Sequence, residues 1–256
     1  MGMMDSLRMI SAMLKLELRR LKHDRAELYM RAIQPILWLM VYGPVMSTVR
    51  AIPTGGIPYT DYIAPGVLIQ STTFVSVFFG LTIVWERESG ILKKLLVAPA
   101  SRYATVIGRS MASGIRAIFQ TFVIIPLALL MGVKFLPNPV HFISAFLIIF
   151  LASGGFSATS ILVASLMKTR ERVMGMGQAI IFPLFFASNA LYPVKMMPQP
   201  LQYFALINPM SYVVDAVRGL LISGDLSNLA IDLAAIALFN ALMFTAASIS
   251  FRKIIE

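Results

Sequence analysis

The chain has 256 residues, of which 58% are hydrophobic and only 13% are charged, about half the charged share of an ordinary soluble domain. This composition excludes a water-soluble globular fold and predicts a chain whose main solvent is lipid. The formal net charge of +10 is typical of nucleic-acid-binding proteins. The distribution of this charge along the chain, given below, argues against a nucleic-acid partner.

An amphipathic helix is predicted at residues 6–28, before the first long apolar stretch. The stretch 1–32 is too charged to hold the uninterrupted apolar core of a signal peptide. The predicted helix either lies in the headgroup plane with its apolar side toward the lipid, or packs on its neighbours as a soluble helix does. Its apolar stripe, at close to helical spacing, is Leu7, Ile10, Leu14, Leu18, Leu21 and Leu28.

Six stretches dominated by apolar residues are long enough to cross a bilayer as helices. We therefore predict an all-α polytopic membrane protein with a single transmembrane domain. Pro35 and Pro44 predict a kink in the first span, and the side chains of Arg109 and Arg116 are expected to reach the headgroups from the inner end of the third. The predicted spans are 32–49, 63–84, 102–133, 142–167, 173–192 and 229–251.

Two further segments differ from ordinary connecting loops. Residues 86–98 are polar and basic with an apolar stripe, and they predict a short amphipathic helix that ends at Pro99. Residues 193–228 are too apolar for a free loop and too rich in proline to span. We expect that segment to be a helical hairpin that re-enters the outer leaflet.

The basic residues divide unequally between the two sides of this topology. Eighteen of the 22 Lys and Arg residues fall on one side, and the other side holds Arg50, Lys134, Lys195 and Arg218. Because basic residues stay on the cytoplasmic side, we expect both termini in the cytoplasm and the chain in the inner membrane. The charge excess then faces anionic lipid headgroups, so we expect contact with membrane lipids and no nucleic acid.

Groups that build catalytic sites are scarce in this chain. It has no cysteine, only two histidines, and no G-x-x-x-x-G-K-[ST] loop to hold ATP phosphates. We therefore expect no catalytic residue, cofactor or metal. The spans also lack the charged residues that ion-coupled carriers hold deep in the bilayer, since the one candidate, Asp232, lies near the outer end of the last span. The energy source is thus expected on another protein, and an ion-coupled carrier or channel is the alternative.

Three stretches carry a resemblance to a known family: DYIAPGVLIQS at 61–71, ERESGILKKLLVAPASRYATVIGRS at 86–110, and FPLFFASNALYP at 182–193 followed by INPMSYVVDAVR at 207–218. They resemble the ABC transporter type-2 permeases, most of all the daunorubicin-resistance and nodulation-type members. The resemblance implies the membrane subunit of an exporter for an amphipathic drug, lipid, glycolipid or polysaccharide. It also implies a second permease chain, identical or different, and two separate ATPase subunits that bind ATP and magnesium.

The resemblance further implies roles for individual residues. An ATPase-coupling helix would include Glu86, Arg87, Glu88, Gly90, Leu92, Leu95 and Pro99. An outer gate would include Pro193, Asn208, Pro209, Tyr212, Asp215 and Arg218, of which Asp215 and Arg218 have the spacing of a helical ion pair. A substrate path between two permease copies would be lined by aromatic residues, unless these serve only helix packing or lipid contact: Phe74, Phe78, Phe79, Phe182, Phe185 and Phe186.

Overall fold

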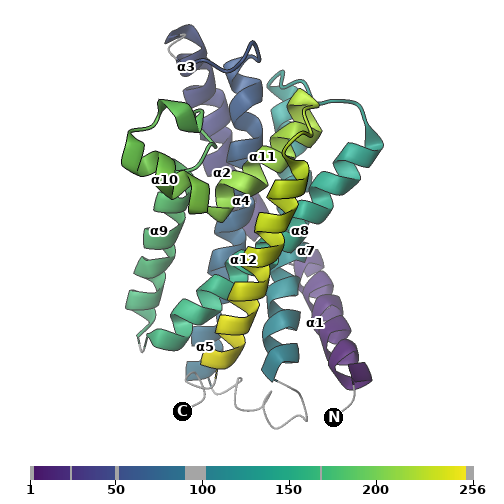
Figure 1. Ribbon diagram of the computed structural model, residues 1–256. Coiled ribbons are helices and arrows are strands. Elements are labelled where there is room, and N and C mark those ends of the chain that lie inside the picture. The colour runs from purple at the N-terminus through teal and green to yellow at the C-terminus, as the bar shows by residue number, and fades with distance from the viewer. Residues whose placement is uncertain (1–2, 24, 50–51, 90–101, 168, 252–256) are drawn as a thin grey trace.

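The computed structural model describes residues 3–23, 25–49, 52–89, 102–167 and 169–251. Every regular element in these ranges is helical (Figure 1), which confirms the all-α prediction. The elements are α1 (Met3–His23), α2 (Arg25–Leu37), η1 (Trp38–Tyr42), α3 (Gly43–Val49), α4 (Tyr59–Leu81), α5 (Ile83–Glu88), α7 (Arg102–Leu130), α8 (Pro139–Leu166), α9 (Arg170–Phe186), η2 (Val194–Met196), α10 (Gln199–Ile207), α11 (Pro209–Arg218), η3 (Gly219–Ser223) and α12 (Leu229–Ser250).

The chain is a multi-pass membrane protein. In the described residues, four helical stretches are long and apolar enough to cross a bilayer: Tyr59–Glu88, Tyr103–Leu130, Pro139–Leu166 and Leu229–Ser250. They correspond to the second, third, fourth and sixth predicted spans. The bent pair of α10 with α11 and η3 would add a fifth crossing if it were one broken span. Six crossings therefore stay a prediction.

The two other predicted spans differ from what the structure shows. The first, 32–49, corresponds to a shorter apolar helical stretch, Ile33–Val49. This stretch comprises the end of α2, the π-helical turn η1 and α3, which follow one another without a break. The fifth, 173–192, was placed too long, because α9 ends at Phe186. Its 17 residues give a length of about 25 Å, short for the hydrocarbon core. The six residues after Phe186 form turns and bends, and two of them, Ser188 and Asn189, are polar.

A bent helix pair occupies the region predicted to re-enter the membrane. Helices α10 and α11 meet at Asn208, and the axes on either side of this break differ by 78°. Proline at the first position of α11 favours a fresh helix start, since its missing N–H is not needed there. In Figure 1 the pair lies in the upper part of the molecule, with α10 beside the end of α9.

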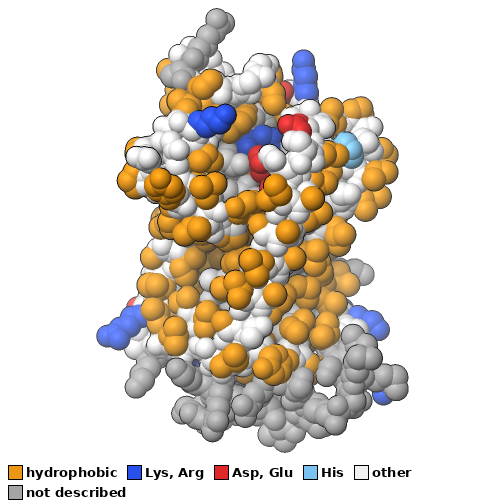
Figure 2. All heavy atoms as spheres, in the orientation of Figure 1, with side chains coloured by type: hydrophobic (Ala, Val, Ile, Leu, Met, Phe, Trp, Pro, Cys, Tyr) orange, Lys and Arg blue, Asp and Glu red, His pale blue; other side chains and the backbone are white. Residues whose placement is uncertain are grey.

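Helix α4 forms the centre of the bundle. Almost all of its residues are buried, and it packs against α7, α8, α9 and α11. Helix α12 lies outside and exposes large apolar side chains along its length, including Ile231, Leu238 and Ile249. Figure 2 shows apolar side chains over the middle of the visible face, with charged side chains toward both ends. This distribution is what a lipid-facing surface requires.

The N-terminal helix differs from its prediction in its buried face. Its described part is Met3–His23; residue 24 lies outside the described residues, and residues 25–28 are helical as the start of α2. Helix α1 packs against α7, so helix packing contributes to its position. Leu18, which the predicted stripe includes, is 41% exposed, whereas Glu17 is 2% exposed. The buried face of α1 therefore carries a carboxylate.

The described start of α1 and the end of α12 lie at one end of the bundle, together with α5 (Figure 1). The loops that precede α4, α8 and α12 lie at the opposite end. We call the first the inner end and the second the outer end, following the charge distribution of the sequence.

Gly66 allows α4 to approach the turn that follows α9. A Cβ atom at Gly66 would lie 2.5 Å from the carbonyl oxygen of Ala190 and 2.8 Å from its Cα. Backbone atoms cannot move aside as a side-chain tip does, so we expect Gly66→Ala to lower the free energy of unfolding by about 1–3 kcal/mol. The thermal unfolding midpoint of the purified protein in detergent measures this loss.

Gly175 on α9 supplies the control, because a Cβ atom there meets nothing within 4 Å. Gly175→Ala should leave the midpoint unchanged or raise it slightly, since alanine favours helix more than glycine does. Equal midpoints for the two variants would contradict the close approach at Gly66.

Candidate functional site

The predicted coupling segment is described only in its first part. Glu86, Arg87 and Glu88 close α5, while Gly90, Leu92, Leu95 and Pro99 lie outside the described residues. Helix α5 follows α4 after a single residue, Thr82. Arg87 donates from both terminal nitrogens to the carbonyl oxygen of Met167, at 3.3 and 3.4 Å. This bond links the coupling segment to the end of α8.

Glu86 links the same segment to α7. Its carboxylate forms an ion pair with Arg109, and the two side chains are 18% and 12% exposed. Arg109 also donates to the Thr82 hydroxyl at 2.6 Å, and its guanidinium lies 5.5 Å from the ring centroid of Phe79. A half-buried pair with these additional contacts is held more firmly than an exposed one.

A second ion pair joins α7 to the N-terminal helix. Arg116 donates from Nε to Glu17 at 2.5 Å, and its guanidinium lies 4.7 Å from the centroid of the same Phe79 ring. We call Glu17, Phe79, Glu86, Arg109 and Arg116 the inner cluster. It connects α1, α4, α5 and α7 through side chains that are mostly shielded from solvent.

The expectation that Arg109 and Arg116 reach the lipid headgroups was therefore wrong. Each arginine binds a carboxylate within the protein, because pairing offsets the desolvation of both charges. Glu17 was missed by the sequence analysis. Its position offered a signal, since it lies three residues after Leu14 and four before Leu21, on the face that the apolar stripe marks as buried.

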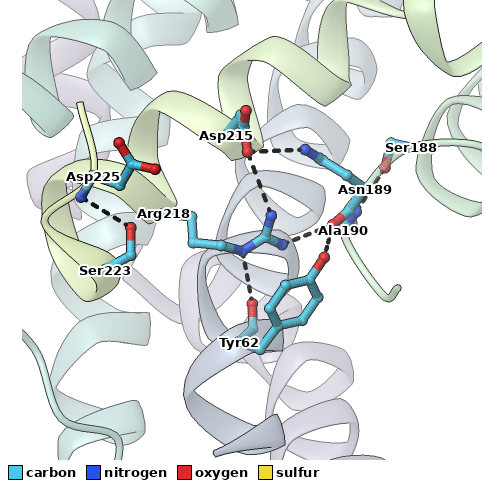
Figure 3. Close-up of polar contacts among 8 residues, drawn as sticks. All are labelled: Tyr62, Ser188, Asn189, Ala190, Asp215, Arg218, Ser223 and Asp225. Atoms are coloured by element: carbon cyan, nitrogen blue, oxygen red, sulfur yellow. Dashed lines mark hydrogen bonds and ion pairs between the residues drawn. The ribbon is translucent and has the colours of Figure 1, made fainter. Parts of the chain in front are cut away.

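At the outer end, Arg218 of α11 is buried and satisfied by main-chain oxygens (Figure 3). It donates from Nε to the Tyr62 carbonyl at 3.2 Å and from a terminal nitrogen to the Asn189 carbonyl at 2.7 Å. The guanidinium also lies 3.9 Å from the Tyr62 ring centroid. The predicted pair with Asp215 is present at 3.8 Å, and Asn189 donates to the same carboxylate at 3.2 Å.

Asn208 fixes the bend between α10 and α11. Its side-chain oxygen accepts from the backbone N–H of Met210 at 3.0 Å and so caps α11. Its amide nitrogen donates to the carbonyls of Leu184 and Ala187, at 2.7 and 3.1 Å. These two oxygens belong to the last turn and C-terminal cap of α9, which Pro183 interrupts. We call Tyr62, Asn189, Asn208, Asp215 and Arg218 the outer joint, since they tie α4, α11 and the turn after α9 together.

Asn208→Ala should lower the free energy of unfolding by about 2–3 kcal/mol, because a helix cap is lost and two carbonyls at a buried site lose their amide donor. Asn228→Ala is the matched control, since Asn228 precedes α12 without a side-chain cap bond. Thermal unfolding in detergent compares the two. An equal shift for both variants would show that the Asn208 bonds contribute nothing specific.

The remaining predicted gate residues shape the same region. Pro193 precedes the short helix η2, and Pro209 begins α11. The Tyr212 hydroxyl donates back to the carbonyl of Leu206 across the bend. The structure thus places all six predicted gate residues around the bent pair and the end of α9.

A small polar pocket of about 90 Å³ lies beside the joint and is lined by Asp215, Arg218, Asp225 and Asp232, among others. Asp225 lies in the exposed loop before α12. The backbone N–H of Ser227 donates to its carboxylate at 3.0 Å and holds the pKa of Asp225 below its ordinary value. In the part of the chain that the structure describes, no group of three or more His, Cys, Asp or Glu side chains could hold a metal ion.

The six phenylalanines predicted to line a path fall into two groups. Phe74, Phe78 and Phe79 lie on α4, and the rings of Phe74 and Phe78 are 4.4 Å apart. The other three lie on α9 and, with Trp38, form an aromatic group in which Phe185 is fully buried. Two of these, Phe182 and Phe186, are each 44% exposed. The buried ring is thus placed for packing, and the two exposed rings face outward.

Comparison with known proteins gives a match over most of the chain. The profile of the ABC-2 type transporter family matches residues 8–222. The chain is 29% identical to the transport permease ycf38 of Cyanophora paradoxa over 78% of its own length and 69% of that protein.

It is also similar to two permeases with drug-resistance names. It is 25% identical to the daunorubicin resistance permease DrrB1 of Streptomyces coeruleorubidus, covering 78% of this chain and 70% of that one. It is 26% identical to the doxorubicin resistance permease DrrC of Mycobacterium tuberculosis, covering 87% and 82% of the two chains.

Proposed function

The chain belongs to the ABC-2 type transporter family and is a membrane permease; from that premise we propose that it exports an amphipathic drug, lipid, glycolipid or polysaccharide across the inner membrane. The energy comes from two separate cytoplasmic ATPase subunits, and a second permease chain completes the transporter. The drug-resistance names of DrrB1 and DrrC support a drug-like substrate.

The observation that carries this proposal is the attachment of the coupling segment to the bundle. Glu86 binds Arg109 of α7, and Arg87 binds the end of α8. An ATPase that pushes residues 86–98 therefore moves α7 and α8 together with α4. Glu17 extends the same connection to α1. In this proposal α1 and the coupling segment are two surfaces at the inner end that one ATPase subunit moves together.

Helix α4 can carry that motion to the outer end. Thr82 follows its C-terminus and binds Arg109, whereas Tyr62 lies in its first turn and binds Arg218. Tyr62 and Thr82 are 20 positions apart, which corresponds to about 30 Å of helix, the thickness of the hydrocarbon core. A shift or tilt of this buried helix would therefore displace the outer joint, which we propose as the exit gate.

The substrate path, in this proposal, runs between two copies of the chain along α4 and α9. The exposed rings of Phe182 and Phe186 offer apolar contact on α9, and Phe74 and Phe78 do so on α4. Phe185 supports them from within through its contact with Trp38. Aromatic surfaces of this kind suit a substrate with a large apolar part.

Reconstitution tests the function directly. The permease and an ATPase subunit that co-purifies with it would be placed in inside-out vesicles, with doxorubicin as the probe. We expect uptake only when ATP and both proteins are present, and we expect doxorubicin to change the ATPase rate, because coupling is reciprocal. Uptake by the permease alone under a proton or sodium gradient would instead support an ion-coupled carrier.

A further inference from the structure

The polar pocket beside the outer joint carries more negative than positive charge. Among the described residues that line it, three are acidic, Asp215, Asp225 and Asp232, and one is basic, Arg218. Asp215 and Arg218 come from α11, Asp225 from the loop before α12, and Asp232 from the first turn of α12. Figure 2 shows acidic side chains near the outer end of the visible face. Since one guanidinium balances one carboxylate, the other two carboxylates leave the pocket negative.

Arg218 already has its partners in the outer joint. Its Nε and one terminal nitrogen donate to main-chain carbonyls, and its other terminal nitrogen lies 3.8 Å from Asp215. Its charge is therefore matched within α11. Asp225 is ionised at neutral pH, because the backbone N–H of Ser227 stabilises the carboxylate and lowers its pKa.

Asp232 is a buried acid whose carboxylate has no donor of its own within the described ranges. The residue is 4% exposed, and neither a hydrogen-bond donor nor a cation from that part of the chain contacts its carboxylate. The N-terminal end of α12 favours a negative charge there without binding it. A buried charge without a partner is costly. Because Asp232 lines the pocket, a cation that entered the pocket would offset that cost.

The size and lining of the pocket select the kind of cation. A metal ion needs several oxygens within about 2.6 Å, and the described acidic side chains form no such group. A primary ammonium makes three N–H bonds at about 2.7–2.9 Å, so it can join carboxylates that stand farther apart. The volume of about 90 Å³ is well below the roughly 300–1,000 Å³ of a site for a whole drug-sized molecule. Only the ammonium end of a larger molecule fits.

We propose that this pocket binds the primary ammonium end of an amphipathic amine, with Asp232 as the main acceptor and Asp225 as the second. Leu226 also lines the pocket and is 38% exposed, so it offers apolar contact to the carbon next to the ammonium. Two kinds of molecule carry this group in the outer leaflet: a lipid with an ethanolamine headgroup, and an exported amine. The site goes beyond the proposed export function, because binding needs neither ATP nor an ATPase subunit.

Native mass spectrometry of the full chain in detergent tests the proposal. The first probe is dioleoyl phosphatidylethanolamine, and its matched counterpart is dioleoyl phosphatidylcholine, whose quaternary ammonium has no N–H. We expect the ethanolamine lipid to bind at least tenfold more tightly, because charge-assisted hydrogen bonds separate the two. A second pair, doxorubicin and N-acetyl doxorubicin, makes the same comparison for a drug amine.

Asp232→Asn should abolish the preference, with about a tenfold loss of affinity for the amine, and it should leave the bundle folded because asparagine keeps the shape of the side chain. Asp225→Asn should cost about threefold, since solvent screens this exposed carboxylate. Asp61→Asn is the matched control: Asp61 is also buried at the outer end and accepts the Lys134 backbone N–H, but it does not line the pocket. It should leave the affinity unchanged.

A preference in the lipid pair alone would assign the ammonium to a membrane lipid, and a preference in the drug pair alone would assign it to an exported amine. The site would be overturned if neither pair discriminated, or if Asp232→Asn changed the preference no more than Asp61→Asn. These measurements use the permease without ATP, so their failure would leave the export proposal intact. An absence of ATP-driven uptake would likewise leave the ammonium preference in place.

Discussion

Arg218→Ala is expected to lower the free energy of unfolding by about 3–5 kcal/mol, the largest stability loss that we expect from a single substitution in this chain. The guanidinium satisfies the carbonyls of Tyr62 and Asn189 and balances Asp215. Alanine would leave these two carbonyls with fewer partners and Asp215 without its opposing charge. Three segments far apart in the chain would then lose their common contact.

Thermal unfolding of the purified protein in detergent measures this effect, together with the yield of monodisperse protein. Arg218→Lys should recover part of the loss, since it restores the charge but not the several directed donors. Lys195→Ala removes an exposed basic residue at the same end and should shift the midpoint little. If Arg218→Ala unfolded no earlier than Lys195→Ala, the outer joint would have no part in holding the fold.

The second large effect is expected at the inner cluster. Glu86→Gln should reduce ATP-driven transport and substrate-stimulated ATP turnover at least tenfold, while basal ATPase activity remains. The neutral amide cannot pair with Arg109, so α5 loses its charged connection to α7, and one charge-assisted contact corresponds to about tenfold or more. Transport in vesicles and ATP turnover, with and without doxorubicin, would be measured on the same preparation.

Glu171→Gln provides the control, because Glu171 is an exposed acidic residue in the first turn of α9. The double variant Glu86→Gln with Arg109→Gln should be little worse than either single variant, because the two residues act as one pair. Simple multiplication of the two single effects, or unchanged stimulation in Glu86→Gln, would disprove coupling through this pair.

The two sets of predictions separate stability from coupling. Arg218 lies where the outer joint holds three segments together, so its loss should appear first as unfolding. Glu86 is partly exposed on α5, and its carboxylate pairs with Arg109, so its loss should leave the bundle folded. A variant of Glu86 that unfolded at low temperature would show that the inner cluster serves the fold more than the transmission of motion.

Much of the architecture was visible in the sequence, because lipid solvent demands long apolar helices whose backbone groups are satisfied internally. The all-α class, four long helices and the broken segment near Asn208 followed from hydropathy and proline placement. The Asp215 and Arg218 pair followed from helical spacing. The helix end at Phe186 did not, because residues 187–192 contain neither proline nor glycine to end a helix, and only Ser188 and Asn189 interrupt their apolar character.

What the tertiary structure decided is which helix faces meet. Glu17 and Arg116 are 99 residues apart, and Arg218 and Tyr62 are 156 apart. Local periodicity shows that a face is buried but not what lies against it, since that depends on close approaches such as the one at Gly66. The apolar segments and their spacing are determined within each helix by its own sequence. The inner cluster and the outer joint arise only when desolvated charges and carbonyls on different helices find partners during packing.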